Sequence, residues 1–320
     1  MEIFNPHSNI HFLGLRRYSI SLAIFLVIAS IALIWGRGLN YGLDFTGGIS
    51  MQANYTQPVR TDEVRNALVK GGIEDPVVQS LGGTRQVLIR FQPKDDTRNS
   101  PKDGKVNLEL VAADVDKALQ AVHPDVKVVS PSYVSPQVGS ELRSSGIVAA
   151  IFVIIGIGLY LWIRFERRFA FAALATEVHD VLVTLGVIAL VQRQFDLTVL
   201  ASVLAVIGYS INDKVVVFDR IRELFRSTRK AEPEDILNRA INSTLSRTII
   251  TSLFTGIAMA ALFFFGGPSV HGFAVTMLIG IVVGTLSSIF VASPILLWLG
   301  VSKKDLMPVT KENPELARRP

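Results

Sequence analysis

The stretch VIGYSINDKVVVFDRIRE, residues 206–223, contains the pattern on which the fold prediction depends. Its first half is apolar enough for a membrane-spanning helix, and its second half ends in the basic residues typical of a membrane border. Asn212 and Asp213 interrupt the apolar half. An ionisable side chain inside a membrane span is costly and is rarely kept without a function. The stretch therefore predicts a membrane-spanning helix that carries a functional carboxylate.

Composition extends this prediction to the whole chain. Of its 320 residues, 49% are hydrophobic, and the mean hydropathy is +0.41. The apolar residues gather in windows close to the roughly 20 residues that a helix needs to cross a bilayer. We therefore expect a polytopic α-helical membrane protein, and the absence of cysteine excludes disulfides and thiolate metal sites. The six predicted spans are residues 18–37, 144–163, 169–191, 195–218, 247–265 and 270–300.

Lysine and arginine predict how the spans are oriented. Basic residues gather in the connections on one side of the membrane, which are Arg16–Arg17, Arg164–Arg168, Arg220–Arg239 and Lys303–Lys304. We therefore expect residues 1–17 and the tail, residues 301–320, to be cytoplasmic, with the first span kept as an anchor. Residues 38–143 then lie on the periplasmic side. The formal charge of +5 reflects this topology and does not indicate nucleic-acid binding.

The segment 38–143 predicts a small α+β domain. Apolar and polar residues alternate at 49–55 as in a strand, and Thr61 and Gly71 suit the ends of a helix. Two short strands joined by a turn at Gly82–Gly83 follow, and then a second helix and a last strand. The order β-α-β-β-α-β predicts a ferredoxin-like sandwich, with both helices on one face of the sheet.

The connection between the fourth and fifth spans, residues 219–246, is unusually long. Its apolar residues recur at helical spacing, and Pro233 suits the start of a helix. This pattern predicts short amphipathic helices that lie at the cytoplasmic surface. The alternative is a basic loop that serves only to set the topology.

Two opposite charges lie at similar depths in the fourth and fifth spans. Asp213 lies about one turn from the inner end of the fourth span, and Arg247 begins the fifth. We therefore predict an ion pair, which is either static or changes when Asp213 takes up a proton. Polar side chains nearby can relay a proton or can simply bond back to their own helix. These relay candidates are Asn212, Ser210, Thr248, Thr251 and Ser252.

A second polar cluster, TEVHD, lies midway along the third span at residues 176–180. His179 titrates near neutral pH when unperturbed, and Asp180 lies one helical turn from Thr176 and Thr184. One histidine and two acids could hold a metal ion, but the spans offer no suitable second histidine ligand. Proton relay and hydrogen bonding between helices are therefore the two interpretations of His179 and Asp180.

Several motifs, in their order and spacing, carry a family resemblance. GLDFTGG follows the first span, HDV lies in the third, STLSRTIITS enters the fifth, and FGGPSVHGFAVTMLIGIVVGT covers the end of the fifth and much of the sixth. Together with VIGYSINDKVVVFDRIRE they resemble the SecD/SecF family of the bacterial Sec protein translocase, in particular its SecF branch. The resemblance extends from about Arg16 to Lys304. It implies six spans forming half of an RND-type transporter, located in the inner membrane.

The resemblance also implies partners and an energy source. SecF-type subunits pair with SecD, act beside the SecYEG channel with YajC as an accessory, and use the proton motive force, or sodium in some bacteria. They promote translocation of unfolded preproteins and their release on the periplasmic side. No cofactor and no enzymatic activity are implied.

The resemblance assigns ion coupling to Asp213 and Arg247. In the resulting hypothesis, charged Asp213 holds Arg247, and neutral Asp213 releases it. The junction motif supplies Gly42, Asp44, Gly47 and Gly48. We interpret the last three as turn-forming residues before the first strand, and a role in coupling is the lesser interpretation.

Two other functions fit the same spans. The first is half of an RND-type exporter of small molecules or lipids, although a periplasmic domain of about 100 residues leaves little room for a substrate pocket. The second is a scaffold of the translocase with a static ion pair. An enzyme is not indicated, because the sequence contains no phosphate loop, nucleophile elbow or zinc motif.

Overall fold

The computed structural model describes residues 10–81, 85–92, 107–228 and 231–302. Within these residues, six helices are long and apolar enough to cross a membrane, as predicted. The sixth is continuous in space but consists of three segments. The helices are α1 (Arg16–Arg37), α5 (Pro136–Arg164), α6 (Arg167–Val191), α7 (Leu197–Ser227), α8 (Pro233–Phe265), and α9 (Pro268–Ser287) continued by η2 (Ser288–Ala292) and α10 (Ser293–Trp298).

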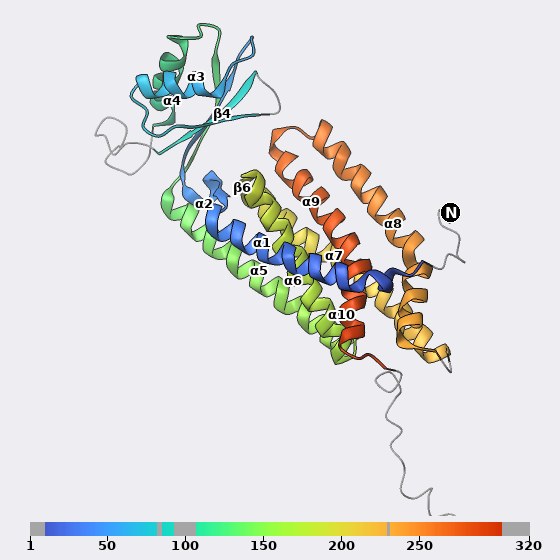
Figure 1. Ribbon diagram of the computed structural model, residues 1–320. Helices are drawn as coiled ribbons and strands as arrows, with labels where there is room; N and C mark the ends of the chain where they lie inside the picture. Colours follow the sequence, from blue (N-terminus) through green and yellow to red (C-terminus); the bar gives the residue numbers. More distant parts are fainter. Residues whose placement is uncertain (1–9, 82–84, 93–106, 229–230, 303–320) are drawn as a thin grey trace, which may run out of the picture.

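The helices form a bundle with inner and outer members (Figure 1). Only 11% of the residues in the most apolar stretches of α1, α5 and α8 are buried, against 44% in α6 and α7 and 56% in the sixth span. The outer helices expose large apolar side chains such as Phe25 and Phe152. The exposed apolar surface of these outer helices suits contact with lipid. The more deeply buried helices α6, α7 and α9 form the core of the bundle.

Small residues allow the inner helices to approach closely. A side chain at Gly280 would collide with Val206 of α7, and one at Gly284 would collide with Ser210. A side chain at Gly186 of α6 would likewise meet Ser30 of α1. This is the packing expected of small residues spaced four apart in membrane helices.

The sixth span changes its helical geometry near its end. A π-helical turn, η2, occupies Ser288–Ala292 and is followed by α10, which contains Pro294. Proline has no N–H to donate and cannot continue regular α-helical bonding. A wider turn is one way for a helix to absorb this interruption.

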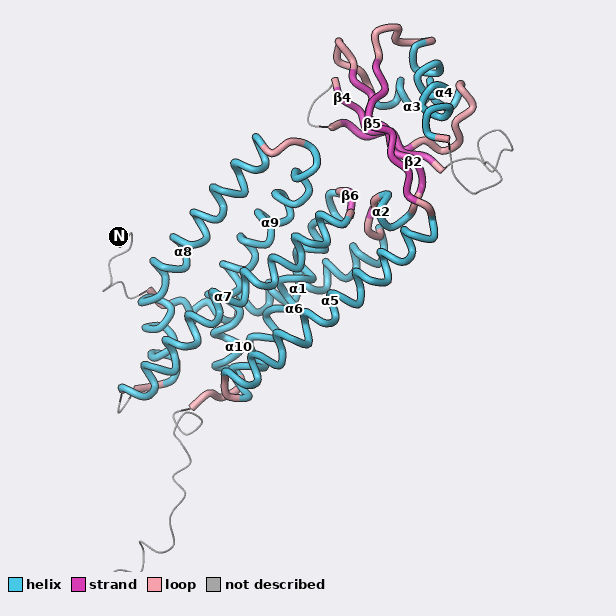
Figure 2. Tube along the Cα trace, turned by 180° about the vertical axis from the view of Figure 1, so that it is seen from behind, coloured by secondary structure: helices cyan, strands magenta, loops and turns pink. Residues whose placement is uncertain are grey.

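The α+β domain lies at one end of the bundle (Figure 1). Its sheet has the antiparallel order β3-β4-β2-β5, and Figure 2 shows α3 and α4 on one face of it. This arrangement confirms the predicted ferredoxin-like order, although Gly82–Gly83 lies outside the described residues. The elements are β2 (Gly48–Asn54), α3 (Thr61–Lys70), β3 (Val77–Ser80), β4 (Gln86–Phe91), α4 (Leu108–Gln120) and β5 (Lys127–Val134).

The prediction of separate surface helices at 219–246 was wrong. The described parts of this segment are direct extensions of α7 and α8. Their apolar residues, Phe225 and Ile236 among them, belong to the core of the bundle. The short helix η1 (Phe12–Leu15) packs there too, because Asn238 of α8 accepts a hydrogen bond from the Leu13 N–H (3.1 Å). Burial against these neighbours explains the helical spacing that the sequence showed.

Candidate functional site

A buried lysine lies at the centre of the inner helices. Lys214 of α7 has no exposed surface. Its ammonium donates to Glu177 Oε2 and Asp180 Oδ2 on α6, each at 2.7 Å, and to Ser210 Oγ at 2.7 Å. All three donors of the ammonium are therefore satisfied. The sequence analysis missed Lys214, although a basic residue inside an apolar window was a signal that could have found it.

Asp180 connects three helices within this cluster. Besides Lys214, its Oδ2 accepts hydrogen bonds from Ser210 Oγ of α7 (2.5 Å) and Ser287 Oγ of α9 (2.7 Å). Its Oδ1 lies 2.8 Å from His179 Nδ1. With His179 neutral, the cluster contains two carboxylates and one ammonium. The carboxylates therefore outnumber the ammonium by one, and one added proton would balance these charges.

Asp213 does not pair with Arg247 in the structure, which differs from the prediction. The Asp213 side chain is buried at 3% exposure, and its Oδ2 has no hydrogen-bond partner within the described ranges. Arg247 is exposed, as is Asn212, and no ion pair joins Asp213 to Arg247 among the described residues. Similar depth in two neighbouring helices did not ensure that the two side chains share a face.

The hydroxyl groups of α8 mostly bond to their own helix. Thr251 and Ser252 donate to the carbonyl one turn earlier, at 3.0 and 2.8 Å. Of the two roles that the sequence left open, Thr251 therefore has the structural one, because its hydroxyl bonds back to its own helix. Ser252 also links three helices, through Tyr209 of α7 (2.9 Å) and Thr285 of α9 (2.6 Å). The buried hydroxyl of Thr248 has no hydrogen-bond partner in the residues that the structure describes. Ser252 is thus the one candidate on α8 that joins a network between helices in the described structure.

The junction motif contacts the start of α7. Strand β1 (Asn40–Tyr41) pairs in parallel with β6 (Gln194–Phe195), just before that helix. The Gly42 N–H then donates to the last carbonyl of β6 at 2.7 Å. Asp44, in the short helix α2 (Leu43–Thr46), accepts a hydrogen bond from the Leu197 N–H at 3.0 Å. Asp44 therefore does more than form a turn, because it satisfies a free amide at the N-terminus of α7.

The two connections of the α+β domain are locked against each other. Gly47 and Gly48 both adopt positive φ, at +70° and +118°, which favours glycine. A Cβ at Gly47 would lie 2.7 Å from Pro136 Cα, and a Cβ at Gly139 of α5 would lie 2.9 Å from the Gly47 nitrogen. The glycines thus permit backbone contact between the connection that enters the domain and the one that leaves it.

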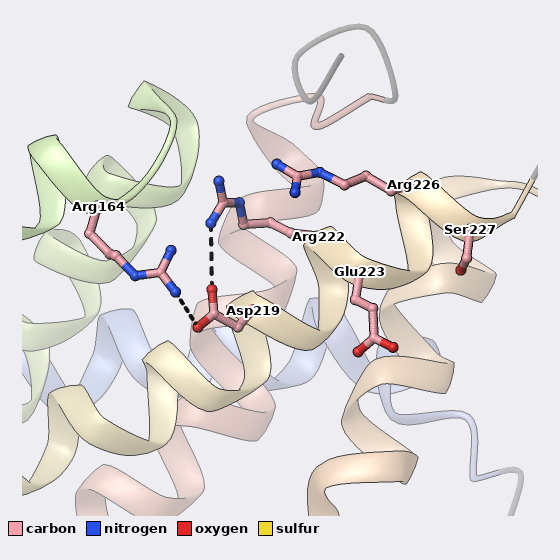
Figure 3. A pocket seen from close by; sticks show the side chains of 6 residues that line it. All are labelled: Arg164, Asp219, Arg222, Glu223, Arg226 and Ser227. Atoms are coloured by element: carbon pink, nitrogen blue, oxygen red, sulfur yellow. Dashed lines mark hydrogen bonds and ion pairs between the residues drawn. The ribbon is translucent and has the colours of Figure 1, made fainter. Parts of the chain in front are cut away.

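An ion-pair network lies around the last residue of α5, Arg164, and Figure 3 shows several of its side chains. Arg164 of α5 and Arg222 of α7 both contact Asp219, at 2.7 and 3.5 Å, and Arg222 also contacts Glu166 at 2.9 Å. Arg226 lies apart from these pairs in the same cleft of about 570 Å³. The network joins α5 to α7 and has no counterpart in the sequence-based predictions.

Comparison with known proteins agrees with this architecture. Residues 114–302 match the family model for the SecD/SecF protein export membrane protein C-terminal region, and residues 32–59 match the model for the SecD/SecF GG motif. The chain is 42% identical over 299 residues to the protein translocase subunit SecF of Pseudomonas aeruginosa, covering 93% of this chain and 94% of that one. It is 40% identical to SecF of Vibrio alginolyticus, covering 100% and 99%.

A solved structure gives the same result. The crystal structure of SecDF from Thermus thermophilus, described as a translocon-associated membrane protein, superposes with a TM-score of 0.82 at 31% identity. The match covers 93% of this chain and 40% of that longer chain. On the six spans, the α+β domain and these matches, the chain belongs to the SecD/SecF family of protein export membrane proteins.

Proposed function

We propose that this chain, with a SecD partner, uses the proton motive force to promote preprotein translocation and release on the periplasmic side. The observation that carries the proposal is the buried Lys214 cluster on α6, α7 and α9, next to Asp213, whose Oδ2 has no hydrogen-bond partner in the described part of the chain. Buried charges add little stability compared with apolar packing. Their presence in a membrane is therefore better explained by a function in which a side chain changes its charge than by stabilisation of the fold.

In the proposed cycle, protonation of Asp213 changes how α7 packs. Removing one charge in a medium of low dielectric constant can bias two arrangements that differ by a few kcal/mol. The structure has Asp213 and Arg247 apart, which is the arrangement that the hypothesis assigns to neutral Asp213. A movement of α7 would reach the α+β domain through β6 and the contact between Asp44 and Leu197.

The proposed location is the bacterial inner membrane, with both termini cytoplasmic and the α+β domain periplasmic. Arg164 ends α5, Arg168 lies in the first turn of α6, and Arg222 lies near the end of α7. Figure 1 shows these helix ends opposite that domain. The positive-inside rule favours this orientation. SecYEG, YajC and unfolded preprotein are the further partners that we propose on the basis of the family.

The test is export of a preprotein in cells that lack the native protein and carry Asp213→Asn. Asparagine keeps the size and hydrogen bonding of the side chain but does not titrate. We expect export to fall to the level of the deletion while the complex with SecD still forms. Asp235→Asn, at an exposed site near the start of α8, is the matched control and should export normally.

The alternative with structural support is a scaffold that stabilises the translocase. Full satisfaction of the Lys214 donors favours it, because a saturated network is also what a static clamp requires. Normal export by Asp213→Asn would support the scaffold and refute ion coupling at this residue.

A further inference from the structure

An apolar groove opens on the outer surface of the bundle, between α1, α6 and the end of the sixth span. Its volume is about 910 Å³. Ile24 and Ile28 of α1, Phe171 of α6 and Ile295 of α10 supply apolar lining. Ile24, Ile28 and Phe171 are exposed large side chains, so none of the described elements covers the groove.

Basic and aromatic side chains line one end of the groove. Arg16 and Arg17 lie at its entrance together with Trp298, which is 85% exposed. Arg16 is engaged with Glu234 at 2.5 Å. Arg17 is exposed and has no ion-pair partner among the described residues. One guanidinium is therefore free at the level where arginine and tryptophan meet lipid headgroups.

The groove extends through about one leaflet. Arg16 and Ile28 are twelve residues apart, which corresponds to about 18 Å along a helix. Half of a hydrocarbon core is about 15 Å thick. At the inner end lies His179, which is 9% exposed and whose Nε2 has no hydrogen-bond partner in the described structure. Its Nδ1 lies 2.8 Å from Asp180, so the floor of the groove borders the buried Lys214 cluster.

We propose that this groove binds an anionic phospholipid, with the phosphate on Arg17 and one acyl chain extending along α1 to His179. The free positive charge matches an anionic headgroup, and the apolar lining matches a hydrocarbon chain. The acyl chain covers His179 and keeps bulk water away from the charged cluster.

The experiment measures lipid retained by the purified full-length chain. Protein in mild detergent is mixed with phosphatidylglycerol or phosphatidylcholine, and bound lipid is counted by native mass spectrometry. Ile24→Trp fills the groove, whereas Leu22→Trp makes the same change at an equally exposed site of α1 outside the lining. Arg17→Gln removes the free charge, and Arg239→Gln is its control at another exposed arginine.

We expect one retained phosphatidylglycerol per chain, a loss of at least threefold in Ile24→Trp and Arg17→Gln, and normal retention in both controls. Equal retention by Ile24→Trp and Leu22→Trp would overturn the site. Equal retention of phosphatidylcholine, with no effect of Arg17→Gln, would overturn the anionic headgroup. Unchanged lipid with weakened SecD association in Ile24→Trp would assign the groove to a protein partner instead. The lipid readout is independent of export, so it does not depend on the proposed function. Only the SecD comparison, measured by co-purification of SecD with each variant, rests on the proposed pairing.

Discussion

Replacing Lys214 with methionine removes the only positive charge in contact with Glu177 and Asp180 among the described residues. Methionine has a similar volume, so the change deletes three hydrogen bonds of 2.7 Å and one charge with little loss of packing. Both carboxylates are buried, at 5% and 0% exposure. Breaking a buried pair by removing one partner costs about 3–5 kcal/mol, which corresponds to a change of roughly 100- to 5,000-fold in the unfolding equilibrium.

The assay is reversible unfolding of the full-length chain in mixed micelles, with increasing denaturing detergent. Lys117→Met, at an exposed site of α4, is the control and should stay within about 0.5 kcal/mol of the parent chain. Adding Asp180→Asn to Lys214→Met should recover part of the loss, because one uncompensated charge disappears. If Lys214→Met unfolds like Lys117→Met and shows no coupling to Asp180→Asn, the buried cluster has no energetic role.

Three further predictions concern the junction and the α+β domain. Asp44→Ala removes the acceptor of the Leu197 N–H. Losing a hydrogen bond worth about 0.5–1 kcal/mol should speed amide exchange in the first turn of α7 roughly two- to fivefold. Asp44→Asn should have a smaller effect. Gly139→Ala forces a Cβ against backbone and should cost about 1–3 kcal/mol in the unfolding assay. Gly156→Ala, on the same helix with open space around it, should be neutral or stabilising. Burial raises the pKa of Tyr55 to about 12, so its contribution to stability is complete below pH 10 and is lost as the pH rises through 12. The difference in phenolate absorbance between the parent chain and Tyr55→Phe measures that titration, and a midpoint near 10 would contradict the burial of the phenol.

Much of the fold could be predicted because its main determinants are local in the sequence. Each membrane span is a continuous apolar window, and each strand of the α+β domain has its own alternation. The small residues Gly280 and Gly284 are spaced four apart, which favours close helix packing in membranes, and the structure identifies their neighbours on α7. The extensions of α7 and α8 were misplaced because an apolar stripe looks the same whether protein or lipid covers it.

The site was harder to predict because it depends on rotation about helix axes. Asp213 and Lys214 are adjacent in sequence but differ by about 100° around α7, so Lys214 meets Asp180 while Asp213 does not. Asp180 was identified from its intramembrane charge, but Ser287 lies 107 residues away and only the assembled bundle brings them together. The groove likewise combines α1 with the end of the sixth span, which no single window could reveal.

The π-helical turn at Ser288–Ala292 also changes which way the two halves of the sixth span face. Eleven residues separate Ser287 from Trp298, and at 100° per residue an unbroken α-helix would place them within about 20° of the same side. A turn with i→i+5 bonding advances less per residue, so five such residues rotate the following segment by roughly a quarter turn. The same apolar span can thus direct the Ser287 hydroxyl to Asp180 and the Trp298 indole to the lipid boundary. Deleting one residue from the turn should restore regular α-helical bonding and leave Trp298 on nearly the same side of the bundle, because ten residues at 100° each also end about 80° away from Ser287.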